Sequence, residues 1–359
     1  MNGLPDFPWD RLASYKERAL AHPGGIVDLS IGTPVDPVPE VAREALTGAA
    51  DSPGYPLTYG TERLRRAAAG WLARRHGVTV APEAVLPTIG TKELVAWLPT
   101  LLGAGPGDRV VHPALAYPTY DVGARLAGAT PYAADGLLGL GPERVPLVWV
   151  NSPSNPTGRV LPPEHLRKVV DWAREHGAVV ASDECYIELG WEENPVSVLH
   201  PEVSGGSHEG LLAVHSMSKR SNLAGYRAGF VTGDPALVAR LLEVRKHAGM
   251  IVPAPVQAAM AAVLDDDAHA AVQRERYAAR RALLRPALEK AGWRIDHSTA
   301  GLYLWASDGR PCWDQARALA DLGILVAPGD FYGPGGGSHI RLAMTASDER
   351  INAAVLRLQ

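Results

Sequence analysis

Three side chains that could take part in acid–base or nucleophilic chemistry follow two short apolar runs of the chain. Asp183 and Tyr186 come directly after AVVAS, and Lys219 comes shortly after LLAVH. A lysine amine whose pKa is lowered can form an imine with a carbonyl compound. A carboxylate at a buried strand end can hold a proton on a ring nitrogen, which makes that ring accept electrons. The three residues therefore favour chemistry on a bound carbonyl cofactor.

A second group of residues could bind a phosphate. Gly90 and Thr91 follow the run VLPTI and open a predicted helix. Free backbone N–H groups and the positive end of the helix dipole favour an anion at that point. Arg227, eight residues beyond Lys219, could grip the same phosphate at two points. A phosphate-binding site, an acid, a phenol and a lysine together predict a site for pyridoxal phosphate.

Each of these residues also has a structural explanation when it is taken alone. An aspartate after a strand often caps a helix, and a single lysine is usually a solvated surface charge. Asn155-Pro-Thr-Gly158 is a typical turn sequence. Lys92 is a second candidate for the imine-forming lysine, because it too follows a predicted strand and neighbours the predicted phosphate-binding residues. The order and spacing of the whole set favour the cofactor site.

The apolar runs that precede these residues are continuous rather than alternating, which is typical of strands buried on both faces of a parallel sheet. Residues 162–176 show apolar side chains at helical spacing, opened by two prolines and closed by a glycine. The alternation predicts an α/β fold with a doubly wound, mostly parallel sheet. We expect an N-terminal arm and small-domain segment over 1–40, a large cofactor-binding domain over 41–250 and a smaller C-terminal α+β domain over 251–359. The expected strands include Pro146–Val150, Ala178–Ala181 and Leu211–Val214.

Composition and charge narrow the possible functions. The chain has 359 residues, 46% of them hydrophobic, and a net charge of −4, so neither nucleic acid nor an anionic membrane is an expected partner. No apolar run approaches the roughly 20 residues that cross a bilayer, and the first residues lack the pattern of a signal peptide. Cys185 and Cys312 suit neither a disulfide scaffold nor a cysteine-rich zinc site. We expect a cytoplasmic protein without a metal site.

The motifs as a set resemble those of the class I/II aminotransferases, the pyridoxal-phosphate enzymes of fold type I. The resemblance depends on SNPTG at 154–158, SDECY at 182–186, SMSK at 216–219, Arg227, and HIRLA at 339–343. It extends from about residue 26 to the end of the chain. It implies a transaminase that takes an amino donor and a 2-oxo acid acceptor, and that works as a homodimer.

The resemblance implies a role for each matched residue. Lys219 would bind the cofactor covalently and transfer protons, Asp183 would hold the pyridine nitrogen, and Tyr186 would contact the ring hydroxyl; these are the expected catalytic residues. The other expected cofactor-binding residues are Gly90, Thr91, Lys92 through its backbone, Tyr117 stacked on the ring, Asn155, Ser216, Ser218, Arg227, and Tyr55 from the partner subunit. The expected substrate-binding residues are Gly32, Asn155 and Arg341, the last of which would grip the α-carboxylate.

Taken as a whole, the sequence resembles those of the actinobacterial succinyldiaminopimelate aminotransferases of lysine biosynthesis. This implies N-succinyl-LL-2,6-diaminopimelate as the donor and 2-oxoglutarate as the acceptor. Aspartate, aromatic or branched-chain donors remain open, as does a β-lyase reaction, because a fold does not fix a reaction. A transcription regulator would need a DNA-binding segment, and residues 1–40 are too short and too proline-rich for one. A nucleotide-binding oxidoreductase is disfavoured, since GAGPGD at 103–108 precedes a predicted strand instead of following one.

Overall fold

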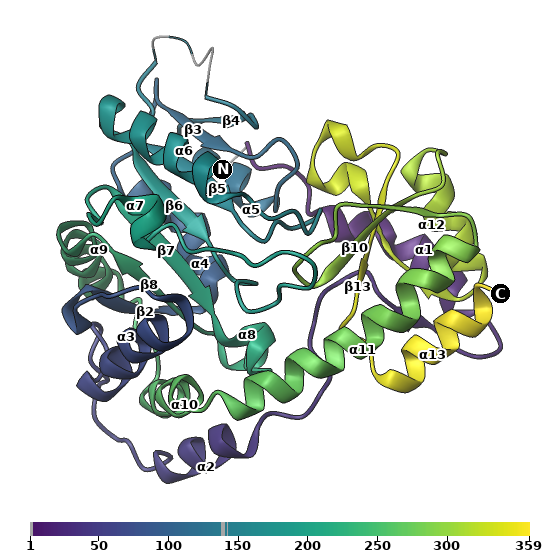
Figure 1. The fold of residues 1–359 in the computed structure, drawn as a ribbon, viewed down its shortest axis with the longest axis horizontal. Coiled ribbons are helices and arrows are strands. Elements are labelled where there is room, and N and C mark those ends of the chain that lie inside the picture. Colours follow the sequence, from purple (N-terminus) through teal and green to yellow (C-terminus); the bar gives the residue numbers. More distant parts are fainter. Residues whose placement is uncertain (1–2, 138–140, 142) are drawn as a thin grey trace.

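The computed structural model describes residues 3–137, 141 and 143–359, and its described part contains a seven-stranded sheet (Figure 1). Neighbouring strands β7 to β3 run parallel, as does β4 beside β3, whereas β8 runs antiparallel to both β7 and β2. The carboxyl ends of the other strands therefore share one sheet edge with the amino end of β8. In sheet order the strands are β2 (Val85–Ile89), β8 (Ala228–Gly233), β7 (Leu211–Ser216), β6 (Val179–Asp183), β5 (Leu147–Asn151), β3 (Arg109–His112) and β4 (Thr130–Ala133).

Helices cover both faces of this sheet, which explains the continuous apolar runs. Along β5, Leu147 and Trp149 belong to one apolar cluster, and Val148 and Val150 belong to the cluster on the opposite face. The Trp149 face is covered by α4 (Gly90–Leu101), α5 (Thr119–Leu126) and α9 (Pro235–Ala248). The opposite face is covered by α2 (Glu40–Gly48), α3 (Glu62–His76), α6 (Pro163–His176), α7 (Pro201–Ser204) and α10 (Ala254–Asp265).

A second, smaller body is built around an antiparallel sheet (Figure 1). Its strands are ordered β12 (Ala327–Pro328), β13 (Ile340–Ala343), β10 (Tyr303–Ser307) and β9 (Arg294–Asp296). A short parallel pair joins β1 (Val27–Asp28) to β11 (Ile324–Leu325), so the N-terminal segment belongs to this body. Its helices are α1 (Ala13–Leu20), α11 (Ala268–Lys290), α12 (Cys312–Asp321) and α13 (Asp348–Arg357).

The doubly wound α/β architecture predicted from the sequence is confirmed. The expected strands at 146–150, 178–181 and 211–214 appear as β5, β6 and β7, and the helix expected at 162–176 is α6. The boundary expected after residue 250 separates α10 from the helices that it packs against, α2 and α3. Val256, Met260 and Leu264 of α10 lie in the core beneath the large sheet. We propose that the large domain continues through α10 and that the small domain begins with α11.

No helix among the described residues has both the length and the apolarity required to cross a membrane.

Candidate active site

A cavity of about 330 Å³ lies at the shared edge of the large sheet, where the small domain and the N-terminal segment meet it. Twelve of the residues that the sequence predicted line this cavity. They are Gly32, Thr91, Lys92, Tyr117, Asn155, Asp183, Tyr186, Ser216, Ser218, Lys219, Arg227 and Arg341. They come together because strand order places the ends of β2, β5, β6 and β7 next to the amino end of β8.

Lys219 lies in the short helix α8 (Met217–Arg220), which begins directly after β7. Ser216 caps this helix, since its Oγ accepts a hydrogen bond from the backbone N–H of Ser218 at 3.1 Å. The Lys219 Nζ donates to the backbone oxygen of Gly32. Burial is the main reason that the pKa of Lys219 falls to about 8, and the charges of Arg341 and Arg227 lower it further. A substantial fraction of neutral amine is therefore available near neutral pH.

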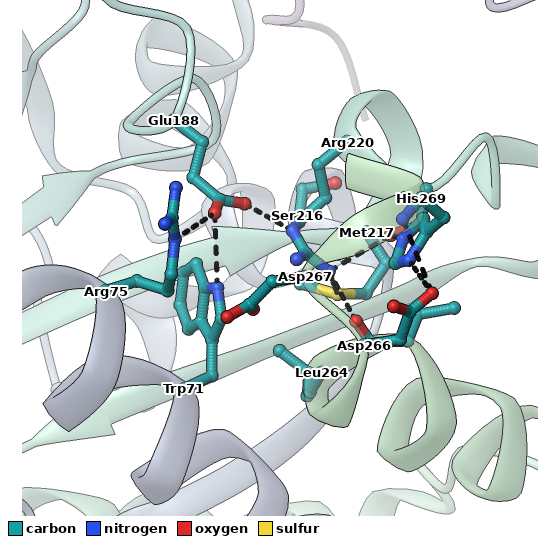
Figure 2. A network of polar contacts seen from close by, with 12 residues as sticks. Trp71, Arg75, Glu188, Ser216, Met217, Arg220, Leu264, Asp266, Asp267 and His269 are labelled. Carbon is teal, nitrogen blue, oxygen red and sulfur yellow. Dashed lines mark hydrogen bonds and ion pairs between the residues drawn. The ribbon is translucent and has the colours of Figure 1, made fainter. Parts of the chain in front are cut away.

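The residue after Lys219 fixes this four-residue helix in place. Figure 2 shows Arg220 contacting the carboxylate of Glu188, which also accepts from Arg75 Nε at 3.3 Å. Arg220 Nη1 donates to the backbone oxygen of Val263 at 2.9 Å. Both members of the Arg220–Glu188 pair are buried, so breaking it would leave an uncompensated buried charge. The pair holds the backbone of Lys219 between α3 and the end of α10.

Asp183 ends β6, where its carboxylate has two donors. Its Oδ2 accepts from the Tyr120 hydroxyl at 2.8 Å, and its Oδ1 accepts from the backbone N–H of Cys185 at 3.2 Å. Burial raises the pKa of Asp183, and these hydrogen bonds oppose that rise. Asn151, the register partner of Asp183 on β5, donates its side-chain amide to the Asp183 backbone oxygen at 2.8 Å. The result is a buried acid in a fixed orientation.

The start of α4 and Arg227 form one compact corner of the cavity. The Gly90 backbone N–H donates to the Arg227 backbone oxygen at 2.8 Å. Gly90 has a φ of +67°, and an added Cβ would lie 2.3 Å from Arg227 Nη2, so glycine is required for this approach. Gly90 itself is absent from the cavity wall. Thr91 and Arg227 line this corner together with Ser216 and Ser218, which is a donor set suited to a phosphate.

Arg341 in β13 is 3% exposed and faces the opposite side of the cavity. Its Nη1 donates to Asn155 Oδ1 at 2.8 Å, and its Nη2 donates to the backbone oxygen of Ser30 at 2.6 Å. Its guanidinium carbon lies 3.9 Å from the Tyr303 ring centre and 4.9 Å from that of Tyr332. Arg341 Nε has no hydrogen-bond partner among the described residues. A carboxylate in the cavity would supply acceptors for this incompletely paired cation.

Sequence reasoning missed several aromatic residues of the cavity. Tyr120 was overlooked although it follows Tyr117 by three residues, and its ring stacks on Trp149 at 4.9 Å. Tyr303 lies with its hydroxyl 3.0 Å from that of Tyr186. Phe7 and Trp9, from the segment expected to form an arm, also line the cavity. The spacing after Tyr117 was a usable signal for Tyr120, whereas nothing local indicated that the other residues would reach this site.

Tyr55 is not part of the cavity of its own chain. It lies between α2 and α3, and 99% of its surface is exposed. Lys92, which was expected to contribute backbone, also presents its side chain: Nζ lies 5.4 Å from the Phe7 ring centre. Burial is the main cause that lowers the pKa of Lys92, followed by the charge of Arg227. Within the residues that the structure describes, Lys92 makes no ion pair.

The fold and the cavity together define an α/β enzyme with a lysine and an acid at the strand ends and a phosphate-binding corner beside them. The family model described as aminotransferase class I and II matches residues 25–358. The chain belongs to this family.

Individual relatives agree with this assignment. The chain is 64% identical to "4-dedimethylamino-4-oxo-anhydrotetracycline transaminase OxyQ" of Streptomyces rimosus, over the full length of both chains. It is 67% identical to "Probable aminotransferase Rv1178" of Mycobacterium tuberculosis, over 99% of this chain and 85% of the relative. An "LL-diaminopimelate aminotransferase" of Aquifex aeolicus is 31% identical over 99% of this chain and 96% of that protein.

A solved structure of similar shape carries the description "probable N-succinyldiaminopimelate aminotransferase" and comes from Thermus thermophilus. It is 29% identical to this chain with a TM-score of 0.87, over 98% of this chain and 99% of the other. The protein is accordingly a pyridoxal-phosphate-dependent aminotransferase, since members of this family use that cofactor.

The cavity residues fit pyridoxal phosphate. A buried carboxylate, a lysine with a pKa near 8 and a phosphate-binding corner line one volume. Arg341 Nε is buried without a partner among the described residues, so this cavity-lining side chain still has a donor that an anionic group could use. This donor set matches an aromatic ring that carries a phosphate, a ring nitrogen and a carbonyl.

Proposed function

We propose that this aminotransferase acts on an acidic amino donor, with N-succinyl-LL-2,6-diaminopimelate as the donor and 2-oxoglutarate as the acceptor. The observation that carries this proposal is a basic side chain in the cavity, Lys92, beyond the three basic residues that already have an assigned role. Arg341 suits the α-carboxylate, and the Lys92 ammonium lies against Phe7 with no ion pair among the described residues. A donor with a distal carboxylate would give Lys92 a partner. The names of the Aquifex and Thermus relatives support the diaminopimelate class.

The roles that we propose for the residues follow from their positions. When bound, pyridoxal phosphate supplies a carbonyl carbon that takes up the amino group and a ring that accepts electrons. Asp183 holds a proton on the ring nitrogen, and Tyr120 keeps the Asp183 carboxylate oriented. Lys219 Nζ would take the α-proton of the donor as a general base and would deliver it, as a general acid, to the carbon that was the cofactor's carbonyl carbon. Arg341 and Asn155 hold the α-carboxylate so that the α-proton faces Lys219.

A second candidate is favoured by one specific finding. The Streptomyces relative is twice as similar to this chain as the Aquifex one, at 64% against 31%, and it is named for a 4-oxo-anhydrotetracycline substrate. Phe7, Trp9 and Ile31 give the cavity an apolar wall against which a fused-ring substrate could pack. Amination of a large polycyclic ketone is therefore the alternative to the acidic donor.

The test is a donor and acceptor panel with the purified holoenzyme. We expect glutamate to form from 2-oxoglutarate fastest with N-succinyl-LL-2,6-diaminopimelate, ahead of LL-diaminopimelate, aspartate, phenylalanine and leucine. A clear preference for one of the last three would overturn the proposed donor but not the class of enzyme. Release of pyruvate and ammonia from L-cystathionine, which carries a thiolate leaving group on Cβ, would indicate a β-lyase. Mass spectrometry of a 4-oxo-anhydrotetracycline incubated with glutamate would reveal the alternative.

We further propose a cytoplasmic homodimer in which Tyr55 reaches the cofactor phosphate of the partner subunit. The supporting observation is an exposed apolar and aromatic surface at Tyr55, Leu57 and Tyr59, beside no cavity residue of its own chain. Light scattering after size exclusion should give twice the mass of one chain, which is 38.2 kDa. Tyr55→Phe should weaken cofactor binding without changing that mass. A monomer with full activity would exclude this arrangement.

A further inference from the structure

Helix α11 carries an unusual buried polar face. Gln273, Tyr277 and Arg280 recur at spacings of four and three residues, which places them on one side of the helix, and all three are buried. Figure 1 shows α11 running from beside α8 and α10 to α13 in the small domain. Buried polar side chains require partners. Several partners of these three lie next to the active site, and Arg280 Nε also donates to Asp348 Oδ1 in α13 at 2.7 Å.

Asp36 is the partner that two of them share. Arg280 Nη2 donates to Asp36 Oδ1 at 2.6 Å and Nη1 donates to Oδ2 at 2.8 Å, while Gln273 Nε2 donates to Oδ2 at 2.8 Å. Burial alone would raise the pKa of Asp36, but the hydrogen bonds from Arg280 and Gln273 outweigh it and the pKa falls. Asp36 is therefore an ionised, fully oriented carboxylate.

The segment before Asp36 passes over the cavity. Ile31, Gly32 and Thr33 line it, and the Gly32 backbone oxygen accepts from Lys219 Nζ. The segment is held on its N-terminal side by the pairing of β1 with β11. Ile31 and Val35 are both exposed, so apolar packing does little to fix the segment between β1 and Asp36. The bonds to Asp36 from Arg280 and Gln273 anchor the segment on its C-terminal side, in addition to the hydrogen bonds that the backbone oxygens of Ser30 and Gly32 accept.

The same face of α11 also contacts the helix that carries Lys219. The Tyr277 hydroxyl donates to the backbone oxygen of Lys219 at 3.2 Å. Gln273 Oε1 accepts from Asn222, two residues beyond α8, at 2.9 Å, and Asn222 also donates to the Pro37 backbone oxygen at 3.2 Å. One helix face therefore holds both Lys219 and the segment that lies across from it.

We propose that Asp36, gripped by Arg280 and Gln273, is a positioning residue that sets the placement of the Ile31–Thr33 segment over Lys219 and thereby the affinity for amino substrates. Because the segment covers the place where any amino donor must enter, this role is independent of the particular donor proposed above. Weaker binding of Asp36 leaves the reactive groups at the strand ends in place. It weakens the surface that binds the amino substrate. Such a change raises KM more than it lowers kcat.

The experiment compares Asp36→Asn with a matched control, Asp108→Asn. Asp108 is likewise held by two guanidinium bonds, from Arg144 at 2.8 and 2.6 Å, and by one further donor, Gly105 N–H at 2.9 Å. The two carboxylate side chains are 10% and 12% exposed. Asp108 does not line the cavity. The partner guanidinium of Asp36 is 2% exposed and that of Asp108 is 62% exposed, so Asp36→Asn should cost more stability. The control therefore tests the loss of a two-point grip away from the cavity, and the melting temperature of each variant reports the structural cost.

We expect Asp36→Asn holoenzyme to show a roughly ten-fold higher KM for L-glutamate and for N-succinyl-LL-2,6-diaminopimelate, with kcat lowered less than about three-fold. Asp108→Asn should keep the wild-type KM. Hydrogen–deuterium exchange of residues 29–35 should be faster in Asp36→Asn only, and this readout does not depend on which donor the enzyme accepts. An unchanged KM and unchanged exchange, or equal changes in both variants, would overturn the proposal.

Gln273→Met serves as a second variant, because it removes one donor from Asp36 and the Gln273 acceptor of Asn222 but retains the guanidinium grip. We expect its KM and its exchange at 29–35 to change in the same direction as in Asp36→Asn, by a smaller factor. A Gln273→Met enzyme with wild-type values for both, if Asp36→Asn cannot be purified, would count against the proposal.

Discussion

The two sides of the cavity are built on different physical principles. The sheet side, which we define as Asp183, Ser216, Lys219 and Arg227, lies at or within three residues of buried strand ends. Paired backbones and apolar clusters on both sheet faces fix these residues.

The covering side is defined as Phe7, Gly32, Tyr303 and Arg341. It comes from the N-terminal segment and from β10 and β13 of the small domain. Phe7 and Ile31, which neighbours Gly32, are about half exposed. Tyr303 and Arg341 are buried, so the exposed part of the covering side is its N-terminal segment. The bond-making groups thus lie at strand ends of the large sheet, whereas substrate recognition is shared between the small domain and this exposed segment. Variants on the sheet side should then lower kcat for every donor, and variants on the covering side should raise KM.

Lys219→Ala should have the largest effect. Loss of the amine removes both the covalent anchor for the cofactor and the proton carrier, so turnover should fall by more than about 1,000-fold. The absorbance band of the lysine-bound cofactor should disappear from the purified protein. Lys168→Ala, an exposed lysine of α6, is the control and should behave as wild type. A Lys219→Ala enzyme that retains the band and turnover would refute the sheet-side assignment.

Arg341→Leu should have the next largest effect and should mark the covering side. It removes the guanidinium that donates to Asn155 and to the backbone of Ser30. We expect kcat/KM for amino acid donors to fall about 100-fold, mainly through KM. Arg341→Lys should recover little, since an ammonium cannot make the two-point contact. An effect confined to kcat would contradict the division between the two sides.

The same division explains what the sequence could predict. Asp183, Lys219 and Arg227 follow or precede continuous apolar runs, and the convergence of strand ends at one sheet edge follows from the α/β pattern. Tyr303 and Phe7 carry no such local signal. Their approach depends on how the small domain and residues 3–10 pack against the sheet, which is a tertiary property.

The placement of α10 is another tertiary contact that the local sequence pattern does not predict. Its sequence is apolar and helical, as expected, but the periodicity did not show that Val256 and Met260 pack beneath the large sheet rather than in the small domain. Arg341 was found only through the motif HIRLA, and its stacking between Tyr303 and Tyr332 was not foreseen. Local pattern therefore predicts elements, whereas contacts between separate bodies require the structure.

Tyr120→Phe tests the sheet side at a residue that the sequence did not single out. The variant keeps the ring on Trp149 and removes one donor from Asp183. Since a hydrogen bond to a charged group contributes about 1.5–3 kcal/mol, we expect kcat to fall roughly ten-fold for all donors.

The pH profile gives Tyr120→Phe a second readout. The lost donor stabilised the carboxylate form, so the pKa of Asp183, already raised by burial, should rise further. Activity needs the ionised acid, and the acidic limb of the kcat/KM profile should therefore move to higher pH. A lower melting temperature with an unmoved acidic limb would show that Tyr120 serves packing only.

Lys92→Met should have the smallest effect and tests the boundary between the two sides. Lys92 belongs to α4 on the large domain, yet its ammonium lies over Phe7 of the covering side. Methionine keeps most of the apolar stem and removes the charge. If the ammonium binds a distal carboxylate, KM should rise roughly five- to ten-fold for N-succinyl-LL-2,6-diaminopimelate and remain within about two-fold for donors with one carboxylate. Equal changes for both kinds of donor, accompanied by weaker cofactor binding, would instead place the Lys92 charge with Arg227 in the phosphate-binding corner and would remove the structural support for an acidic donor.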